Sequence, residues 1–238
     1  MTELWNRLVK LFYPQRCACC KKINPSEKQV CEECETDLRP VDDPYCRKCG
    51  LPLKYCVCSD RNYLFTGAAA PFYNSGASQK GIYALKFGSH YGAAEFFGKK
   101  MAECYKKYFP KADAEYVCFV PMSRKGKKKR GYNQAELLAK SFAECTEIKL
   151  KDLFCEAKKH ETQHTHSFEE RIKNVKGVYK ANCSLDGKTI VLIDDIRTTG
   201  ATLNECAKQL RLAGAEKVYC ISALVTVNTY CKPKHKGI

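Results

Sequence analysis

The chain has 238 residues, which is enough for one α/β core of about 100 to 200 residues with a small appendage, but not for two large domains. Lysine and arginine outnumber aspartate and glutamate by 41 to 26, and the formal charge of +15 favours polyanionic partners such as nucleic acid, phosphorylated small molecules or acidic lipid. Residues 1–13 do not read as a secretory signal and no stretch approaches the roughly 20 apolar residues of a membrane span, so we expect a cytoplasmic protein.

The first residues predict a short amphipathic helix. Leu4, Leu8, Leu11 and Phe12 recur at helical spacing, with Trp5 beside them and basic residues on the other faces. We favour packing of this helix on the protein's own body, and contact with the inner face of the membrane is the alternative.

Cysteines dominate the next segment. Nine of the 17 cysteines lie within residues 17–58, and in a reducing cytosol such a group indicates metal ligands rather than disulfides. The first set consists of two CxxC pairs separated by ten residues, which suits one tetrahedral zinc ion: Cys17, Cys20, Cys31 and Cys34. The second set ends in a tighter CxC pair: Cys46, Cys49, Cys56 and Cys58.

We expect both zinc ions to be structural, because four sulfur ligands leave no open coordination position for catalysis. Cys19 is then a spare thiol. Each site with four thiolates carries a net charge of −2, so two filled sites lower the formal charge from +15 to +11. The predicted domains are residues 1–62, with the N-terminal helix and the double ribbon, and residues 63–238, with the join near residues 59–66.

From Gly67 onward, short apolar strands alternate with helices, which predicts a parallel or mostly parallel sheet. The expected strands and helices are Tyr116–Pro121, Gln134–Cys145, Thr189–Ile193, Leu203–Ala213 and Val218–Val227. Gly214 closes the last long helix, so residues 190–227 form a complete βαβ unit.

A strongly basic run follows the first of these strands. Residues 121–133 read PMSRKGKKKRGYN, and six of the seven residues from Arg124 to Arg130 are basic. A charge run alone is most often a solvated loop, but a run between a strand and a helix suits a diphosphate or a nucleic-acid backbone. We therefore assign nucleic-acid binding to Lys127, Lys128, Lys129, Arg130 and Tyr132.

Aromatic residues beside basic ones are candidates for stacking on unpaired bases. Tyr105, Tyr108 and Phe109 meet that description, but each could equally belong to the core. Tyr132, next to the basic run, is the one aromatic residue that we assign to stacking.

The segment VLIDDIRTTGAT at residues 191–202 places two carboxylates after a buried strand, and then a turn before a helix that begins near Thr202. Asp194 and Asp195 lie where ribose hydroxyls could donate to them, and Gly200 lets the backbone approach an anion closely. The amides and hydroxyls that would bind a phosphate belong to Thr198, Thr199, Gly200, Ala201 and Thr202. An ordinary crossover with an acid pair on the surface is the less favoured alternative.

This segment resembles the signature of type I phosphoribosyltransferases, in which the paired acids hold ribose and the turn holds the 5-phosphate. Further motifs resemble, in chain order, those of the ComF family of competence proteins. They are the double zinc ribbon, LKFG at residues 85–88, RGYNQAELLA at residues 130–139, Gln163, and ERIKNVKGVY at residues 170–179. The family has Phe where this chain has Tyr179.

The resemblance implies an α/β fold with a type I phosphoribosyltransferase core, Rossmann-like with a mostly parallel sheet and a hood loop, after a small N-terminal cysteine-rich zinc ribbon domain. In the hood loop, His160, His164 and His166 are expected to contact substrate or DNA rather than a metal. The resemblance also implies 5-phosphoribosyl-1-diphosphate as a ligand, Mg²⁺ bound with it, and Asp194, Asp195 and Arg130 in the catalytic positions.

The function implied by the resemblance is DNA uptake in natural transformation, with binding of single-stranded DNA and with a competence helicase and a recombination mediator as protein partners. An active phosphoribosyltransferase that transfers ribose 5-phosphate to a nucleobase or a nucleic-acid acceptor, with release of diphosphate, is the second hypothesis. A scaffold with a relic sugar site is the third. Residues 63–76 carry no base-selecting motif, so the acceptor is not predicted.

Overall fold

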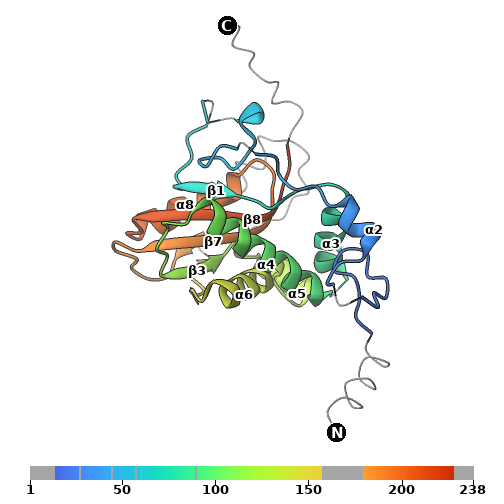
Figure 1. Ribbon diagram of the computed structural model, residues 1–238. Coiled ribbons are helices and arrows are strands. Elements are labelled where there is room, and N and C mark those ends of the chain that lie inside the picture. Colours follow the sequence, from blue (N-terminus) through green and yellow to red (C-terminus); the bar gives the residue numbers. More distant parts are fainter. Residues whose placement is uncertain are drawn as a thin grey trace, which may run out of the picture.

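A computed structural model gives the fold (Figure 1). It describes residues 14–26, 28–43, 45–56, 58–59, 61–88, 90–156 and 179–227. The predicted N-terminal helix, the three histidines of the predicted hood loop and the motif residues from 163 to 178 lie outside the described residues. Among the helices that are described, none combines the length and the apolar character that crossing a membrane requires.

A six-stranded sheet forms the centre of the molecule, and all of its strand pairs are parallel. Its order is β1, β8, β7, β3 and β4, and β2 continues beside β8 after β1 ends. The strands are β1 (Gly67–Ala69), β2 (Phe72–Tyr73), β3 (Tyr116–Phe119), β4 (Lys149–Leu150), β7 (Thr189–Arg197) and β8 (Lys217–Val225). The parallel sheet predicted from the alternation of strands and helices is confirmed.

A separate antiparallel pair joins β5 (Phe154–Glu156) to β6 (Tyr179–Ala181). These two short strands stand on either side of residues 157–178, the segment that contains most of the predicted hood loop. Tyr179, at the start of β6, is buried.

Helices cover both faces of the sheet, and the alternation of side chains along β7 decides which residue meets which helix. Val191 and Ile193 pack into the core formed with α4 (Tyr91–Tyr108) and α6 (Gln134–Thr146), whereas Ile190 and Leu192 pack into the core formed with α8 (Ala201–Leu212). The remaining described helices are α2 (Glu32–Asp37), α3 (Gly76–Phe87), α5 (Arg124–Arg130) and the short 3-10 helix η1 (Leu53–Tyr55).

The central strand is longer than predicted. β7 continues to Arg197 because its pairing with β8 continues to Val225. The sequence had predicted that the two aspartates follow the strand, but they lie inside it. Because successive strand residues face opposite sides of the sheet, Asp194 and Asp195 point into different surroundings.

The basic run between β3 and α6 forms a short helix of its own, which was not predicted from the sequence. The Ser123 side chain accepts a hydrogen bond from the Gly126 amide at 3.2 Å and so caps the first turn of α5. Gly131, with a φ of 81°, ends the helix in the left-handed conformation. The basic residues of the last turn also interact favourably with the helix dipole.

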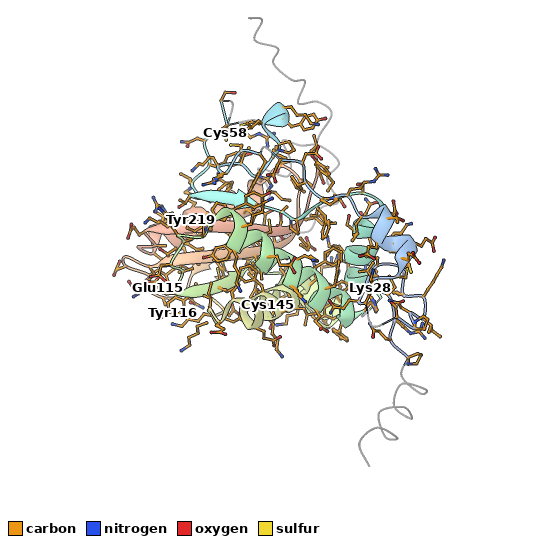
Figure 2. The ribbon with its side chains drawn as sticks, in the orientation of Figure 1. Lys28, Cys58, Glu115, Tyr116, Cys145 and Tyr219 are labelled. Atoms are coloured by element: carbon orange, nitrogen blue, oxygen red, sulfur yellow. The ribbon has the colours of Figure 1, made fainter. Side chains whose placement is uncertain are left out.

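The two cysteine sets pack on different parts of the sheet domain (Figures 1 and 2). Cys17 and Cys34 of the first set join the core of α3 and α4, and Nε2 of His90 lies 2.9 Å from the Cys17 carbonyl oxygen. Cys49 of the second set packs against Phe65 beside β1. In Figure 1 α2 lies alongside α3, and η1 lies above β1; Figure 2 labels one residue from each ribbon, Lys28 and Cys58.

Candidate functional site

A cavity of about 230 Å³ opens at the carboxyl ends of β3 and β7. Its lining comes from four parts of the chain: Val120, Pro121, Met122, Ser123, Arg130, Asn133, Gln134, Ala135, Tyr179 and Asp194. The carboxyl edge of a parallel sheet is where ligands of α/β proteins usually bind. Two of the predicted site residues, Arg130 and Asp194, are thus brought to one cavity although 64 positions separate them in sequence.

Asp195 is held by a polar network under this cavity. Its side chain is only 6% exposed, and Oδ2 accepts a hydrogen bond of 2.8 Å from the Gln134 amide. Lys86 of α3 forms an ion pair with the same oxygen, also at 2.8 Å. The ion pair and the hydrogen bond together fix the orientation of this buried side chain.

Asp194 lines the cavity instead. Its Oδ1 accepts a hydrogen bond of 2.8 Å from the amide of Asp195, which fixes the side chain at the end of the strand. Burial, together with the negative charge of Asp195, raises the pKa of Asp194 to about 8. A carboxyl group in this state gains from a cation or a hydroxyl donor that enters the cavity.

The turn after β7 has the geometry of an anion site. Gly200 adopts a φ of 78° before α8 begins, and the Ala201 amide donates to Oγ1 of Thr199 at 3.1 Å. Among the described residues, no acceptor pairs with the amides of Thr198, Thr199 and Gly200. Free amides at the start of a helix are ready to bind a phosphate.

The segment that joins the second ribbon to β1 holds this turn from outside. Arg61 donates from Nη1 to the Thr199 carbonyl oxygen at 2.8 Å. The Tyr63 ring lies against Gly200, where a Cβ atom would approach the ring at 3.4 Å. The Leu64 amide donates to Oδ1 of Asn204 in α8 at 2.6 Å. The conformation of the turn therefore depends on residues that precede the sheet.

Arg197 links the turn directly to the second ribbon. It is the last residue of β7, is only 4% exposed, and donates from Nη1 to the Cys49 carbonyl and from Nη2 to the Gly50 carbonyl, the latter at 3.2 Å. Burial lowers the pKa of its guanidinium group. Among the ion pairs of the described residues, none joins Arg197 to a carboxylate, and its two hydrogen bonds go to backbone carbonyls of the second ribbon.

Both cysteine clusters fit a tetrahedral zinc ion. In each cluster the four Sγ atoms lie within 4.8 Å of one another. Neighbouring Sγ atoms are 3.7 Å apart for Cys20 and Cys31, 3.7 Å for Cys46 and Cys58, and 3.8 Å for Cys49 and Cys56. Zn–S bonds of about 2.3 Å in a regular tetrahedron place sulfur atoms about 3.8 Å apart. The second cluster has this geometry despite its tight CxC pair.

The cysteines differ in how well they suit a metal. Burial by itself would raise the pKa of Cys17, but amide donors from Cys20, Cys31 and Cys19 outweigh it and lower the pKa to about 6. Cys19, in contrast, is buried and its pKa is raised to about 12, mainly by burial. It lies outside both clusters, as its assignment as a spare thiol predicts.

Other predicted residues are placed as follows. Lys127, Lys128 and Lys129 are exposed on α5, and Arg130 donates to Oε1 of Gln134 at 3.2 Å. Tyr132 is partly buried and donates from its hydroxyl to the Leu85 carbonyl. Tyr105 and Phe109 belong to the core, and the hydroxyl group of Tyr108 bonds to Asp43. These three aromatic residues, which we did not assign to stacking, therefore serve the fold.

The sequence did not identify Lys86, Arg61 or Arg197 as parts of the site. Lys86 lies in the LKFG motif, so a signal for it was present in the chain. Arg61 stands at a position where no motif is recognisable, and only the folded chain brings it to the turn. Arg197 lies within the motif at residues 191–202, but its contact with the Cys49 carbonyl is seen only in the folded chain.

Two family models match the chain. Residues 8–62 match the double zinc ribbon domain, and residues 126–237 match the phosphoribosyl transferase domain. The first match contains both cysteine clusters. The second contains Arg130, Tyr179 and Asp194 of the cavity and begins after the lining residues 120–123.

Curated proteins are similar to this chain over most of its length or over part of it. Competence protein ComFC of Bacillus subtilis (strain 168) is 29% identical over 199 residues, which are 79% of this chain and 80% of that protein. Competence protein F of Haemophilus influenzae is 26% identical over 223 residues, 87% of this chain and 95% of that protein. DNA utilization protein YhgH of Escherichia coli (strain K12) is 29% identical over 108 residues, 44% of this chain and 48% of that protein.

Solved structures with a similar fold include glutamine phosphoribosylpyrophosphate amidotransferase from B. subtilis, complexed with ADP and GMP. The TM-score is 0.41 and the identity 22%, over 63% of this chain and 28% of that chain. Purine phosphoribosyltransferase from Pyrococcus horikoshii Ot3 gives a TM-score of 0.36 with 16% identity, over 57% of this chain and 84% of that chain.

The raised pKa of Asp194 predicts a stability that depends on pH. The folded protein favours the neutral carboxyl group up to a pKa of about 8, whereas the unfolded chain ionises near 3.8, so stability is lost as the pH rises between these values. We expect Asp194→Asn to raise the melting temperature at pH 8.5 and to leave it nearly unchanged at pH 4. Scanning calorimetry at both pH values, with the exposed Asp113→Asn as the control, measures the difference; an equal shift at both would contradict the raised pKa.

The buried Arg197 predicts a large loss of stability on substitution. Arg197→Met removes two hydrogen bonds from a charged donor and leaves the Cys49 and Gly50 carbonyls buried without partners, which should cost about 3 kcal/mol or more. Arg211 makes one bond to a carbonyl oxygen from an exposed position, so Arg211→Met should cost less than about 1 kcal/mol. Chemical denaturation of the zinc-loaded proteins compares the two, and equal losses would show that the buried bonds contribute little.

Proposed function

The chain belongs to the ComF family of competence proteins, which join a double zinc ribbon to a type I phosphoribosyltransferase domain, and on this premise we propose that it binds 5-phosphoribosyl-1-diphosphate and single-stranded DNA during DNA uptake. The observation that carries the proposal is the cavity at the carboxyl edge of the sheet, with an acid on one side and the basic helix α5 on the other. The proposed setting is the cytoplasm.

Each part of the sugar diphosphate has a chemically suited group at this edge. The unpaired amides of the turn after β7 suit the 5-phosphate. Asp194 is oriented to accept from a ribose hydroxyl, and Asp195, already bound to Lys86 and Gln134, would hold the end of the strand in position. Arg130 lines the same cavity and would bind the diphosphate, whose oxygens match a guanidinium group.

Mg²⁺ also fits this donor set. In nucleotide and diphosphate sites the ion is usually bound through the substrate's phosphate oxygens and one or two protein carboxylates. Asp194 is the carboxylate that lines the cavity. When bound, the ion would neutralise the negative charge of the diphosphate.

The exposed residues of α5 support DNA binding. None of the residues of α5 is buried, and Lys127, Lys128 and Lys129 are exposed; of these, Lys127 has its Nζ 3.9 Å from Oε2 of Glu136. Each phosphate that a lysine neutralises releases a counterion, which makes binding favourable at low salt and independent of sequence. Lys127, Lys128, Lys129 and Arg130 are the proposed phosphate contacts.

A second candidate function is phosphoribosyl transfer. The buried network of Lys86, Gln134 and Asp195 favours it, because a binding turn alone would not need a carboxylate held so rigidly beside the sugar. In that reaction the bond from the anomeric carbon to the diphosphate breaks with the electron pair on the leaving oxygen, and a new bond forms to an acceptor, a nucleobase or a nucleic-acid group. Release of diphosphate distinguishes this function from binding alone.

The protein partners implied by the family, a competence helicase and a recombination mediator, are part of the same proposal. Contact of residues 1–13 with the inner face of the membrane is the alternative to their packing on the protein's own body. Co-purification with the full chain tests the first, and flotation with vesicles of anionic lipid tests the second.

The double variant Asp194→Asn with Asp195→Asn should abolish binding of 5-phosphoribosyl-1-diphosphate in the presence of Mg²⁺, because the acceptors for ribose and the metal ligand are lost. Calorimetric titration measures binding, and metal analysis should find unchanged zinc. Since Asp195 supports the strand, the single variant Asp194→Asn is measured as well and should lose at least tenfold in affinity, about 1.4 kcal/mol. Unaltered binding by both variants would contradict the site.

An assay of diphosphate release, with and without single-stranded DNA or nucleobases, separates the two candidate functions.

Replacing Lys127, Lys128, Lys129 and Arg130 together by alanine should weaken DNA binding and flatten its salt dependence. Each lost phosphate contact lowers the slope of log K against log salt by about 0.7 for single strands. The matched control removes four exposed lysines that lie at or just before the amino ends of β3, β4, β7 and β8: Lys111, Lys149, Lys188 and Lys217. Both variants lose four charges, so an equal change in slope would mean that only the net charge matters and that the DNA surface lies elsewhere.

A further inference from the structure

Beside α5, the surface exposes three large aromatic side chains. Tyr83 and Phe87 lie on α3, and Tyr91 begins α4. The exposed fraction is 48% for Tyr83, 69% for Phe87 and 56% for Tyr91. Tyr83 and Phe87 are four residues apart, so they share one face of the helix, and their ring centres are 5.9 Å apart. We call Tyr83, Phe87 and Tyr91 the aromatic patch.

The fold does not account for this patch. The opposite side of α3 already supplies the buried contacts, through Ile82 and Leu85, and Lys86 reaches from the same turn to Asp195. Leaving three aromatic rings in water forgoes the hydrophobic gain of burying them. Exposed aromatic side chains grouped in this way mark a binding surface.

The charge around the patch identifies its partner. Arg130 of α5 lies over the Phe87 ring at 5.1 Å, and the Tyr91 ring lies 5.5 Å from that of Tyr132. Aromatic rings beside a row of cations are the combination that binds unpaired nucleic acid, because bases stack on the rings while phosphates contact the cations. An apolar protein partner or a second copy of this chain, itself at +15, would have to approach the basic helix without this complementarity.

We propose that the aromatic patch is a stacking surface for unpaired nucleobases, with the phosphates of the same strand on α5. This inference rests on the proposed function and specifies where the bases lie. Arg130 also lines the cavity with Asp194, so a strand on the patch passes the opening of the sugar-phosphate site. Both ligands then share one guanidinium group.

The test compares two oligonucleotides of equal length and charge, a dT 12-mer and its abasic counterpart, by fluorescence anisotropy over a series of salt concentrations. The variant is Tyr83→Ala with Phe87→Ala, and Phe87→Trp is the variant that restores a ring. The control is Leu212→Ala, which removes an exposed apolar side chain from α8 at 72% exposure. The three substituted side chains, Tyr83, Phe87 and Leu212, are exposed, so the variants should fold, and zinc content and melting temperature check this.

Base stacking on an aromatic ring contributes a factor of about ten or more per base. We expect the double alanine variant to bind the dT 12-mer at least tenfold more weakly, with an unchanged salt slope. The same variant should bind the abasic strand like the wild type. The Phe87→Trp variant should retain the wild-type affinity for the dT 12-mer. An unchanged affinity for the dT 12-mer would overturn the inference and leave the proposed function intact. So would an equal loss on both strands, or a change only in self-association or vesicle binding. A wild-type protein that binds neither strand would overturn both.

Discussion

The candidate site depends on a buried cation at the junction of the two parts of the chain. Arg197 ends the central strand and donates to the backbone carbonyls of the second ribbon, immediately before the turn with the unpaired amides. The guanidinium group is buried, and a zinc ion bound by four thiolates in this ribbon would place a net negative charge close to it. The second ribbon is therefore a support for the phosphate turn as well as an appendage to the sheet domain.

Asp194 and Asp195, near the end of β7, have different roles because successive residues of a strand face opposite sides of the sheet. Asp195 faces α3 and α6, where Lys86 and Gln134 satisfy it, and it is a fixed part of the fold. Asp194 faces the cavity, where burial and the neighbouring negative charge disfavour its ionised form. The free protein thus retains an unfavourable group at the place where a ligand would improve its surroundings, a common property of functional sites.

The proposed ligands meet at one edge of the sheet for a physical reason. Parallel strands end together, and the helices that follow them start together, so acids, free amides and the basic helix α5 gather within one region. Arg130 belongs to this region and also contacts the aromatic patch, which makes it a link between sugar diphosphate and nucleic acid. If both ligands bind as proposed, this arrangement would let one ligand alter the affinity for the other, and linkage requires the effect to be reciprocal.

The sequence by itself determined the chemistry of the protein: the two cysteine sets from their spacing, the parallel sheet from the alternation of strands and helices, and the acid pair and turn from a local motif. These features are local, because metal ligands, strand periodicity and turn residues are set by short-range geometry. The helical form of the basic run depended on the Ser123 cap and Gly131, signals that the charges obscured. Only the tertiary structure decided that Lys86 pairs with Asp195, that Arg61 and Arg197 hold the turn, and that the aromatic patch lies beside Arg130. Such contacts join residues far apart in sequence, and packing brings them together without leaving a pattern in the chain.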